Sequence, residues 1–129
     1  MLLAFACLHV LCYDLWFYAV HRTLHIPAVY NRFHYQHHAH RNPTWQHTFA
    51  AHALENGLSG LGLFLPAACL PVRAGPLATA WLFCFLRGFA RHDKRLPWSQ
   101  HHLEHHLLPT CNFSAMYVDY LFGTLAKSH

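Results

Sequence analysis

The sequence predicts an all-α fold, built as an integral-membrane helical bundle around clustered histidines. Hydrophobic residues make up 54% of the chain and charged residues only 11%, whereas an ordinary soluble domain carries about 25% charged residues. One apolar stretch is as long as a membrane helix, and two shorter ones flank a tight turn. The fifteen histidines gather beside these stretches, several of them at the spacing of one helix face.

The length of 129 residues fits a single domain that spans 1–129. The formal charge is +4. The Lys and Arg residues stand in small groups near the histidines. No basic stripe interleaved with aromatic residues is present, so nucleic acid is not expected as a partner. We interpret the positive charge as a bias toward one side of a membrane.

Residues 2–20 form the first predicted membrane helix. About 19 residues at 1.5 Å each span roughly 28 Å, which matches a bilayer core. Asp14 interrupts this apolar run, and a carboxylate in such a helix is usually functional. It precedes His21 by seven residues and His25 by eleven, on the same helical face. We therefore expect Asp14 to accept a hydrogen bond from the ring N–H of a metal-binding histidine.

Prolines punctuate the next part of the chain. Ile26-Pro27 ends the first helix. Residues 28–41 are too polar to span a bilayer, so we expect a helix at the membrane surface there. A further helix is predicted to start near Thr44, and it places His52 and Glu55 on one face.

A helical hairpin is predicted over the two shorter apolar stretches, residues 57–70 and 77–90, with 71–76 as the turn. Each arm has about 14 residues and is short for a full span, so the hairpin would dip into the membrane or barely cross it. Basic residues follow both the first helix and the hairpin. The positive-inside rule therefore predicts a multi-pass protein with these ends in the cytoplasm. The residues concerned are Arg22, Arg32, Arg41, Arg91, Lys94 and Arg95.

A last helix is predicted to begin after Leu96-Pro97-Trp98, with Ser99 as a candidate cap, and to end at Pro109. The tail, residues 112–124, is expected to pack on the cytoplasmic face of the histidine site. All histidine clusters then lie on that side of the membrane.

Three histidine clusters have metal-ligand spacing. Two spell H-x-x-H-H and one has histidines four apart, so each cluster could aim its imidazoles at a single point. Eight histidines are too many for one ion and suit two. They are His21, His25, His34, His37, His38, His102, His105 and His106. His92 is a further candidate ligand, and His52 is a candidate ligand or a partner of Glu55. Asp14, Glu55 and His101 are expected to lie beside the site rather than to bind the metal.

Imidazole ligands suit zinc, iron, copper and nickel alike. The chain has only five acidic residues and lacks the paired glutamate motifs of soluble di-iron bundles. A ligand shell made only of imidazoles would leave the two metal ions with most of their positive charge. This favours reduction of dioxygen and attack on a C–H bond.

Two alternatives remain open. Residues 101–105 contain H-x-x-E-H, the signature of a zinc hydrolase, although that function would leave the earlier clusters without a role. The chain could also be a membrane metal-binding protein without catalytic activity.

The chain resembles the fatty acid hydroxylase superfamily, which includes sterol C4-methyl oxidases, sterol C5-desaturases and sphingolipid hydroxylases. The resemblance rests on residues 14–25, 34–38, 51–55, 92–97, 101–106 and 119–124. It implies a membrane-embedded oxygenase with two iron ions, which zinc could replace in purified protein. It also implies O2, a lipid substrate (fatty acyl, sphingolipid or sterol) and two electrons from a cytochrome b5, a ferredoxin or a reductase. By matched motif, the eight clustered histidines would be the metal ligands.

Members of this superfamily usually have two further membrane helices upstream of the first motif, whereas this chain opens almost on it. A compact form, a fragment and a homo-oligomer that completes its own bundle are all compatible with this difference. Some members carry a histidine where this chain has Gly88.

Overall fold

The computed structural model describes residues 1–126, and its regular elements in this range are all helical, with no strand. The all-α prediction is therefore confirmed. The longer helices are α1 (Leu2–Leu24), α4 (Ala53–Leu61), α5 (Ala74–Arg91) and α6 (Gln100–Leu107). The shorter ones are α2 (Pro27–Val29), α3 (Tyr35–His38) and α7 (Met116–Leu121), together with 3-10 turns at Trp45–His47, Gly62–Ala68 and Pro97–Ser99 and a π-helical turn at Tyr30–His34.

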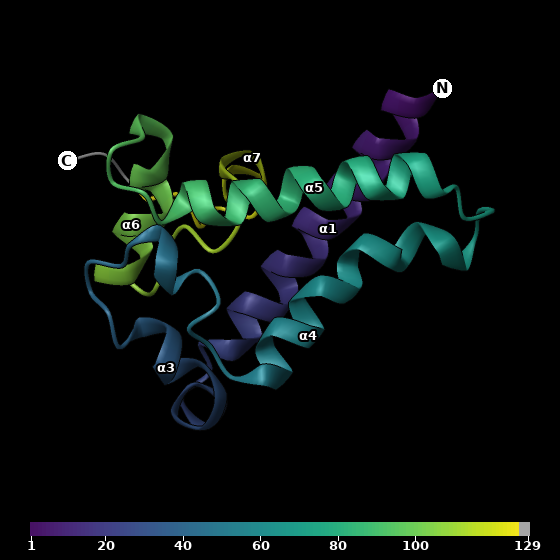
Figure 1. Cartoon of the computed structure of the whole chain (residues 1–129). Helices are drawn as coiled ribbons and strands as arrows, with labels where there is room; N and C mark the ends of the chain where they lie inside the picture. Colours follow the sequence, from purple (N-terminus) through teal and green to yellow (C-terminus); the bar gives the residue numbers. More distant parts are fainter. Residues whose placement is uncertain (127–129) are drawn as a thin grey trace.

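Helix α1 lies against the hairpin made by α4, the Gly62–Ala68 turn and α5 (Figure 1). It continues past the predicted membrane stretch to Leu24, ends just before Ile26-Pro27 as predicted, and carries His21 in its last turn. Among the described residues, α1 is the one helix long and apolar enough to cross a membrane by length and composition, with a mean hydropathy of 1.6. That the hairpin enters the membrane stays a prediction.

A close approach joins α1 to the hairpin. The indole Nε1–H of Trp16 donates a hydrogen bond to the backbone oxygen of Leu58, at 2.7 Å. A β-carbon at Gly62 would lie only 2.9 Å from the Trp16 side chain, which is too close for any residue but glycine. Glycine at this position therefore lets the two backbones pack together.

The segment between α1 and α4 differs from the prediction. The surface helix ends at His38, and a π-helical turn divides it. The helix expected from Thr44 is a single 3-10 turn, Trp45–His47, at whose start the Thr44 backbone N–H donates to Nδ1 of His47. Helix α4 begins only at Ala53, where the ring of His52 accepts a hydrogen bond from the backbone N–H of Leu54.

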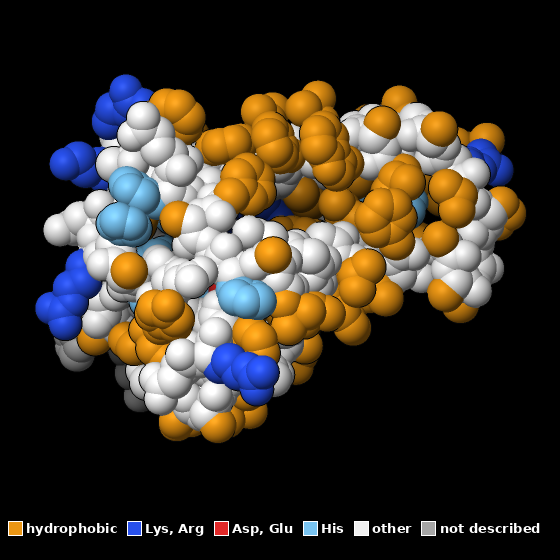
Figure 2. Space-filling model, turned by 60° about the horizontal axis from the view of Figure 1, so that its bottom comes forward, with side chains coloured by type: hydrophobic (Ala, Val, Ile, Leu, Met, Phe, Trp, Pro, Cys, Tyr) orange, Lys and Arg blue, Asp and Glu red, His pale blue; other side chains and the backbone are white. Residues whose placement is uncertain are grey.

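Apolar and basic side chains occupy different parts of the surface. Trp81, Leu82 and Phe83 on α5 are exposed, and Figure 2 shows apolar side chains gathered over the hairpin. Most of the Lys and Arg side chains in that view lie at the opposite end, with surface histidines. An apolar surface of this kind suits a lipid environment or another protein surface.

Candidate metal centre

The three histidine clusters meet at one end of the molecule, although they are far apart in the sequence. They come from the end of α1, from the segment that ends in α3, and from α6. Nine histidines form two groups, in each of which the potential ligand atoms all lie within 4.8 Å of one another. The five-histidine group contains His21, His25, His34, His38 and His105, and the four-histidine group contains His37, His92, His102 and His106.

The grouping corrects one expectation. Each H-x-x-H-H cluster was expected to aim at a single point, but both are divided between the groups. His34 and His38 belong to one group and His37 to the other; likewise, His105 is separated from its neighbours in α6. Helical spacing fixes only which residues share a broad face, and the packing of other helices against that face decides which atoms converge.

Four nitrogen atoms form a closed ring in the five-histidine group. The Nε2 atom of His21 lies 3.1 Å from those of His34 and His105, and the Nε2 atom of His25 lies 3.1 Å from the same two. Nitrogen ligands about 2.1 Å from a metal ion and at right angles to each other are about 3 Å apart. The ring therefore has the spacing of adjacent ligands around one ion.

On the other side of the imidazole rings, hydrogen bonds determine which ring nitrogen carries the proton. A backbone carbonyl oxygen faces Nδ1 of two of these histidines: Phe113 O to His21 at 2.5 Å and Cys111 O to His105 at 2.6 Å. The two oxygens accept, so Nδ1 of His21 and of His105 carries the proton and Nε2 of each has a lone pair. Two lone pairs thus point together, an arrangement that a bound cation stabilises. Glu55 Oε1 lies 2.9 Å from Nδ1 of His34, but the contact lacks hydrogen-bond geometry.

The four-histidine group also has ligand character. Nε2 of His102 lies 3.1 Å from Nε2 of His92, whose Nδ1–H donates to the backbone oxygen of Gly88. Nδ1 of His37, Nδ1 of His102 and both ring nitrogens of His106 are buried without a hydrogen-bond partner among the described residues. Buried polar atoms without a partner are costly, and a metal ion would satisfy one nitrogen of each ring.

Burial keeps several of these imidazoles neutral. It lowers the pKa of His25 to about 3, of His38 and His92 to about 4, and of His106 to about 2, and neighbouring histidines lower the pKa of His25, His38 and His106 further. Only neutral imidazole offers a lone pair to a metal. The residues therefore fit two metal ions with all-imidazole shells, and the donor set is compatible with iron or zinc.

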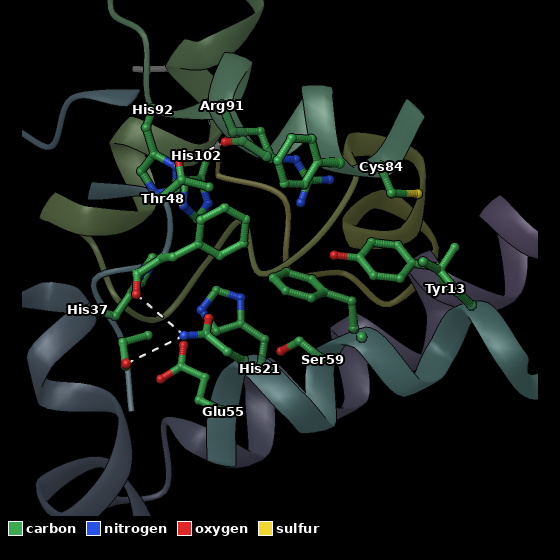
Figure 3. Close-up of a pocket in the computed structure, with 18 of the residues that line it drawn as sticks. Tyr13, His21, His37, Thr48, Glu55, Ser59, Cys84, Arg91, His92 and His102 are labelled. Atoms are coloured by element: carbon green, nitrogen blue, oxygen red, sulfur yellow. Dashed lines mark hydrogen bonds between the residues drawn. The ribbon is translucent and has the colours of Figure 1, made fainter. Parts of the chain in front are cut away.

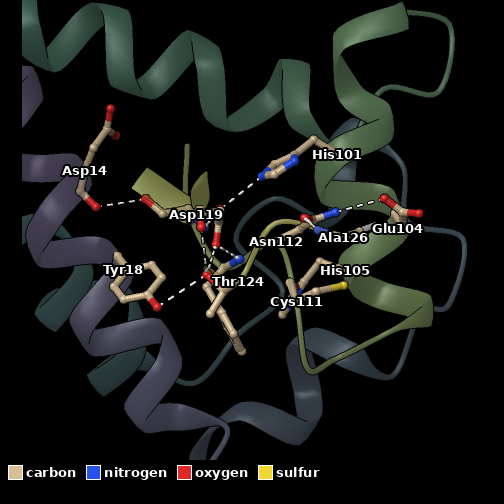
Figure 4. A network of polar contacts seen from close by, with 12 residues as sticks. Asp14, Tyr18, His101, Glu104, His105, Cys111, Asn112, Asp119, Thr124 and Ala126 are labelled. Carbon is tan, nitrogen blue, oxygen red and sulfur yellow. Dashed lines mark hydrogen bonds and ion pairs between the residues drawn. The ribbon is translucent and has the colours of Figure 1, made fainter. Parts of the chain in front are cut away.

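The C-terminal tail supports two of the candidate ligands (Figure 4). The loop that offers the Phe113 and Cys111 carbonyls is held by Asp119, which is fully buried and accepts bonds from the backbone N–H groups of Phe113 and Ser114, both at 2.8 Å. His101 donates to the same carboxylate at 3.0 Å. His101 belongs to neither histidine group, and its role beside the site stays a prediction.

Two other predicted residues lie elsewhere. Asp14 does not bond to a histidine; its carboxylate pairs with Arg87 and accepts a hydrogen bond from the Tyr117 hydroxyl at 2.9 Å. An apolar helix needs a buried cation beside such a carboxylate, and Arg87 supplies it. His52 lies outside both groups and caps α4. The backbone carbonyls of the tail carry no sequence signal, so sequence reasoning could not find them.

A cavity of about 180 Å³ opens beside the histidines, between α1, α4 and α5. Figure 3 shows His21, His37, His92 and His102 at one end of it and Tyr13 at the other. Aromatic and aliphatic side chains make most of the remaining wall, namely Phe17, Phe49, Leu63, Trp81 and Phe85. The arrangement could hold an apolar molecule with one of its carbons near the metal-binding groups.

Comparisons with known proteins agree with these observations. The model of the family described as "Fatty acid hydroxylase" matches residues 6–124. "Methylsterol monooxygenase 1-2" of Arabidopsis thaliana is 31% identical over 127 residues, which cover 83% of this chain and 42% of the relative. The chain thus spans less than half the length of this curated relative. No solved structure matches the chain.

Proposed function

This chain belongs to the fatty acid hydroxylase family, and we propose that it is a membrane-bound oxygenase that hydroxylates or desaturates a lipid with O2 and two electrons. One observation carries the proposal: two groups of mostly buried imidazoles converge at the end of an apolar cavity. A cavity of this kind suits an unactivated hydrocarbon, and the histidines suit redox-active metal ions.

Two iron ions are proposed as the cofactors, one for each histidine group. When bound, such a pair supplies the activation of O2 and the oxidation of a C–H bond. The protein's part is to hold the ligands. The carbonyls of Phe113 and Cys111 fix the ring orientation of His21 and His105, as hydrogen-bond partners of metal ligands commonly do. The carboxylate of Glu55 lies against His34, with Oε1 2.9 Å from Nδ1.

The cavity wall positions the substrate. Its aromatic side chains exclude water and hold an apolar chain in one orientation, which brings the reacting carbon to the histidine end. Glu55 Oε2 is buried and has no hydrogen-bond partner among the described residues. Because Glu55 also lines the cavity, this oxygen is placed to accept a hydrogen bond from a hydroxyl group there. The substrate could be fatty acyl, sphingolipid or sterol; the Arabidopsis relative is named for a methylsterol.

We place α1 across the membrane and the hairpin partly within it, with the histidine end in the cytoplasm. The basic side chains at that end support this orientation. An electron donor, a cytochrome b5, a ferredoxin or a reductase, would then reach the site from the cytoplasm. A second copy of the chain could complete the membrane bundle, and the exposed apolar side chains of α5 would suit such a contact.

The zinc hydrolase alternative is disfavoured by the position of Glu104. Its Oε2 atom accepts a hydrogen bond from Asn112 at 2.9 Å, and Glu104 belongs to neither histidine group. A hydrolase of that kind needs this glutamate beside the metal-bound water.

Metal analysis combined with lipid analysis tests the proposal. Protein purified from iron-supplemented cells should contain two irons per chain. With a reductant and O2 it should convert a host lipid into a product heavier by one oxygen atom or lighter by two hydrogen atoms. A full zinc complement, with no O2 consumption even after iron replaces the zinc, would instead identify a non-catalytic metal-binding protein.

A further inference from the structure

A single permanent positive charge stands in the wall of the apolar cavity. Arg91 is the last residue of α5 and directly precedes His92, and it is the one Lys or Arg among the described residues that line the cavity. Figure 3 shows Arg91 and His92 side by side at the histidine end. A cation in such a place needs an explanation, because guanidinium groups are rarely left in apolar surroundings without a partner.

No partner for this charge exists within the described part of the chain. The Arg91 side chain forms no ion pair there within 4.0 Å and no hydrogen bond, and its guanidinium carbon lies 5.6 Å from the ring centre of Phe17. Stacking on an aromatic ring uses the face of the guanidinium and leaves its N–H groups free. Glu55, the one acid among the described residues that line the cavity, lies against His34 and forms no ion pair with Arg91.

The contrast with Arg87 shows that this is not a general feature of α5. Arg87 lies one helical turn earlier, and its charge is neutralised by the buried carboxylate of Asp14. Helix α1 therefore provides a carboxylate partner for one arginine of α5, and the next arginine of α5 faces the cavity without one. The planar guanidinium fork matches carboxylate and phosphate oxygens, to which it can donate two parallel hydrogen bonds.

We propose that the cavity binds an amphipathic molecule whose oxyanion, a carboxylate or a phosphate, pairs with Arg91. The apolar part of the ligand then lies along the aromatic wall toward Trp81 and Tyr13. The inference rests on the proposed function only in naming the ligand as the substrate. In that case the oxidised carbon lies close to the anionic end of the lipid, because Arg91 adjoins a histidine of the metal-binding groups.

Equilibrium binding of three probes with one chain length tests the site. Hexadecanoate, hexadecyl phosphate and hexadecan-1-ol would be titrated into the metal-loaded full chain in detergent micelles. The wild type should bind at least one of the two anions about tenfold more tightly than the alcohol. Arg91→Met should remove this preference and leave alcohol binding within about twofold, and Arg91→Lys should keep part of it.

Arg95→Met is the matched control, since it removes the same charge from an exposed side chain that pairs with Asp93 at the surface. It should bind all three probes as the wild type does. Whichever anion loses affinity in Arg91→Met identifies the source of the oxyanion. An equal loss for anion and alcohol, an equal loss in Arg95→Met, or no preference in the wild type would each overturn the inference.

Metal content and oxygenase activity would be measured on the same samples. An anion preference that depends on Arg91, in a chain without oxygenase activity, would refute the proposed function and keep the binding site. Oxygenase activity on a lipid, without any effect of Arg91 on the anion preference, would refute only the binding site. Each of the two proposals can therefore be refuted without refuting the other.

Discussion

The imidazole Nδ1–H of His21 donates a hydrogen bond to the backbone oxygen of Phe113, at 2.5 Å, although the two residues are 92 positions apart. The contact joins the end of the first helix to the C-terminal tail. It also sets which nitrogen of His21 remains available to a metal ion. The tail is thus part of the candidate metal centre, although its side chains do not belong to either histidine group.

Replacing Asp119 tests this role of the tail. Asp119→Ala removes the carboxylate that holds the loop carrying the Phe113 and Cys111 carbonyls, so the rings of His21 and His105 lose their fixed orientation. Metal affinity should fall about 10- to 100-fold, measured as metal retained against a graded chelator. Asp93→Ala, which removes an acid from a surface ion pair, should retain metal as the wild type does. Equal retention in both variants would contradict the assignment.

Two buried histidines should respond differently to substitution. His105→Ala removes one of the four nitrogens that form the closed ring. We expect it to abolish activity and to lower metal affinity by about 100-fold or more. His9→Ala removes only a hydrogen bond to the Leu63 backbone oxygen, so it should largely keep activity and lower the free energy of unfolding by about 1–3 kcal/mol. Comparable activity in the two variants would show that the site is wrongly placed.

His92 and His52 form a second discriminating pair. Both were candidate ligands, but His92 belongs to the four-histidine group and His52 caps α4. His92→Ala should lower the metal content by about one ion per chain. His52→Ala should keep the full metal content and cost about 1 kcal/mol of stability through the lost cap. Metal analysis and thermal unfolding check the two outcomes, and metal loss from His52→Ala would reverse the assignment.

The metal-free protein should lose stability in mild acid. The pKa of His38 and His92 lies at about 4 in the folded chain, against an ordinary value of 6.5. Between these values the unfolded chain binds more protons than the folded one, so the free energy of unfolding falls as the pH decreases from 6.5 toward 4. Denaturant titrations of the chelator-treated protein at several pH values measure this slope. A flat profile over that range would show that these imidazoles are not held neutral by the fold.

Local patterns predicted the helices well. The apolar run of α1, the break at Pro27 and the hairpin with its turn all depend on nearest neighbours in the chain. Local reasoning failed between α3 and α4, where only the 3-10 turn Trp45–His47 forms in place of the expected helix.

The sequence predicted which histidines come together but not how they are arranged. Helical spacing marked eight histidines, and the structure gathers them together with His92; that they bind metal stays a prediction. The division into two groups depends on how α3 and α6 face each other, which no spacing within either helix encodes. The partner of Asp14 is Arg87, 73 positions away, and a distance of that kind leaves no trace in a local pattern.

The Asp14–Arg87 pair also bears on the order in which the chain is made. Asp14 leaves the ribosome long before Arg87 and Tyr117, which together satisfy its carboxylate. In the membrane placement proposed above, α1 carries an uncompensated acid in the middle of an apolar segment until they arrive, which hydrocarbon tolerates poorly. Under that proposal, stable placement of the first helix depends on the synthesis of most of the chain, and an early stop in translation would leave that helix poorly anchored.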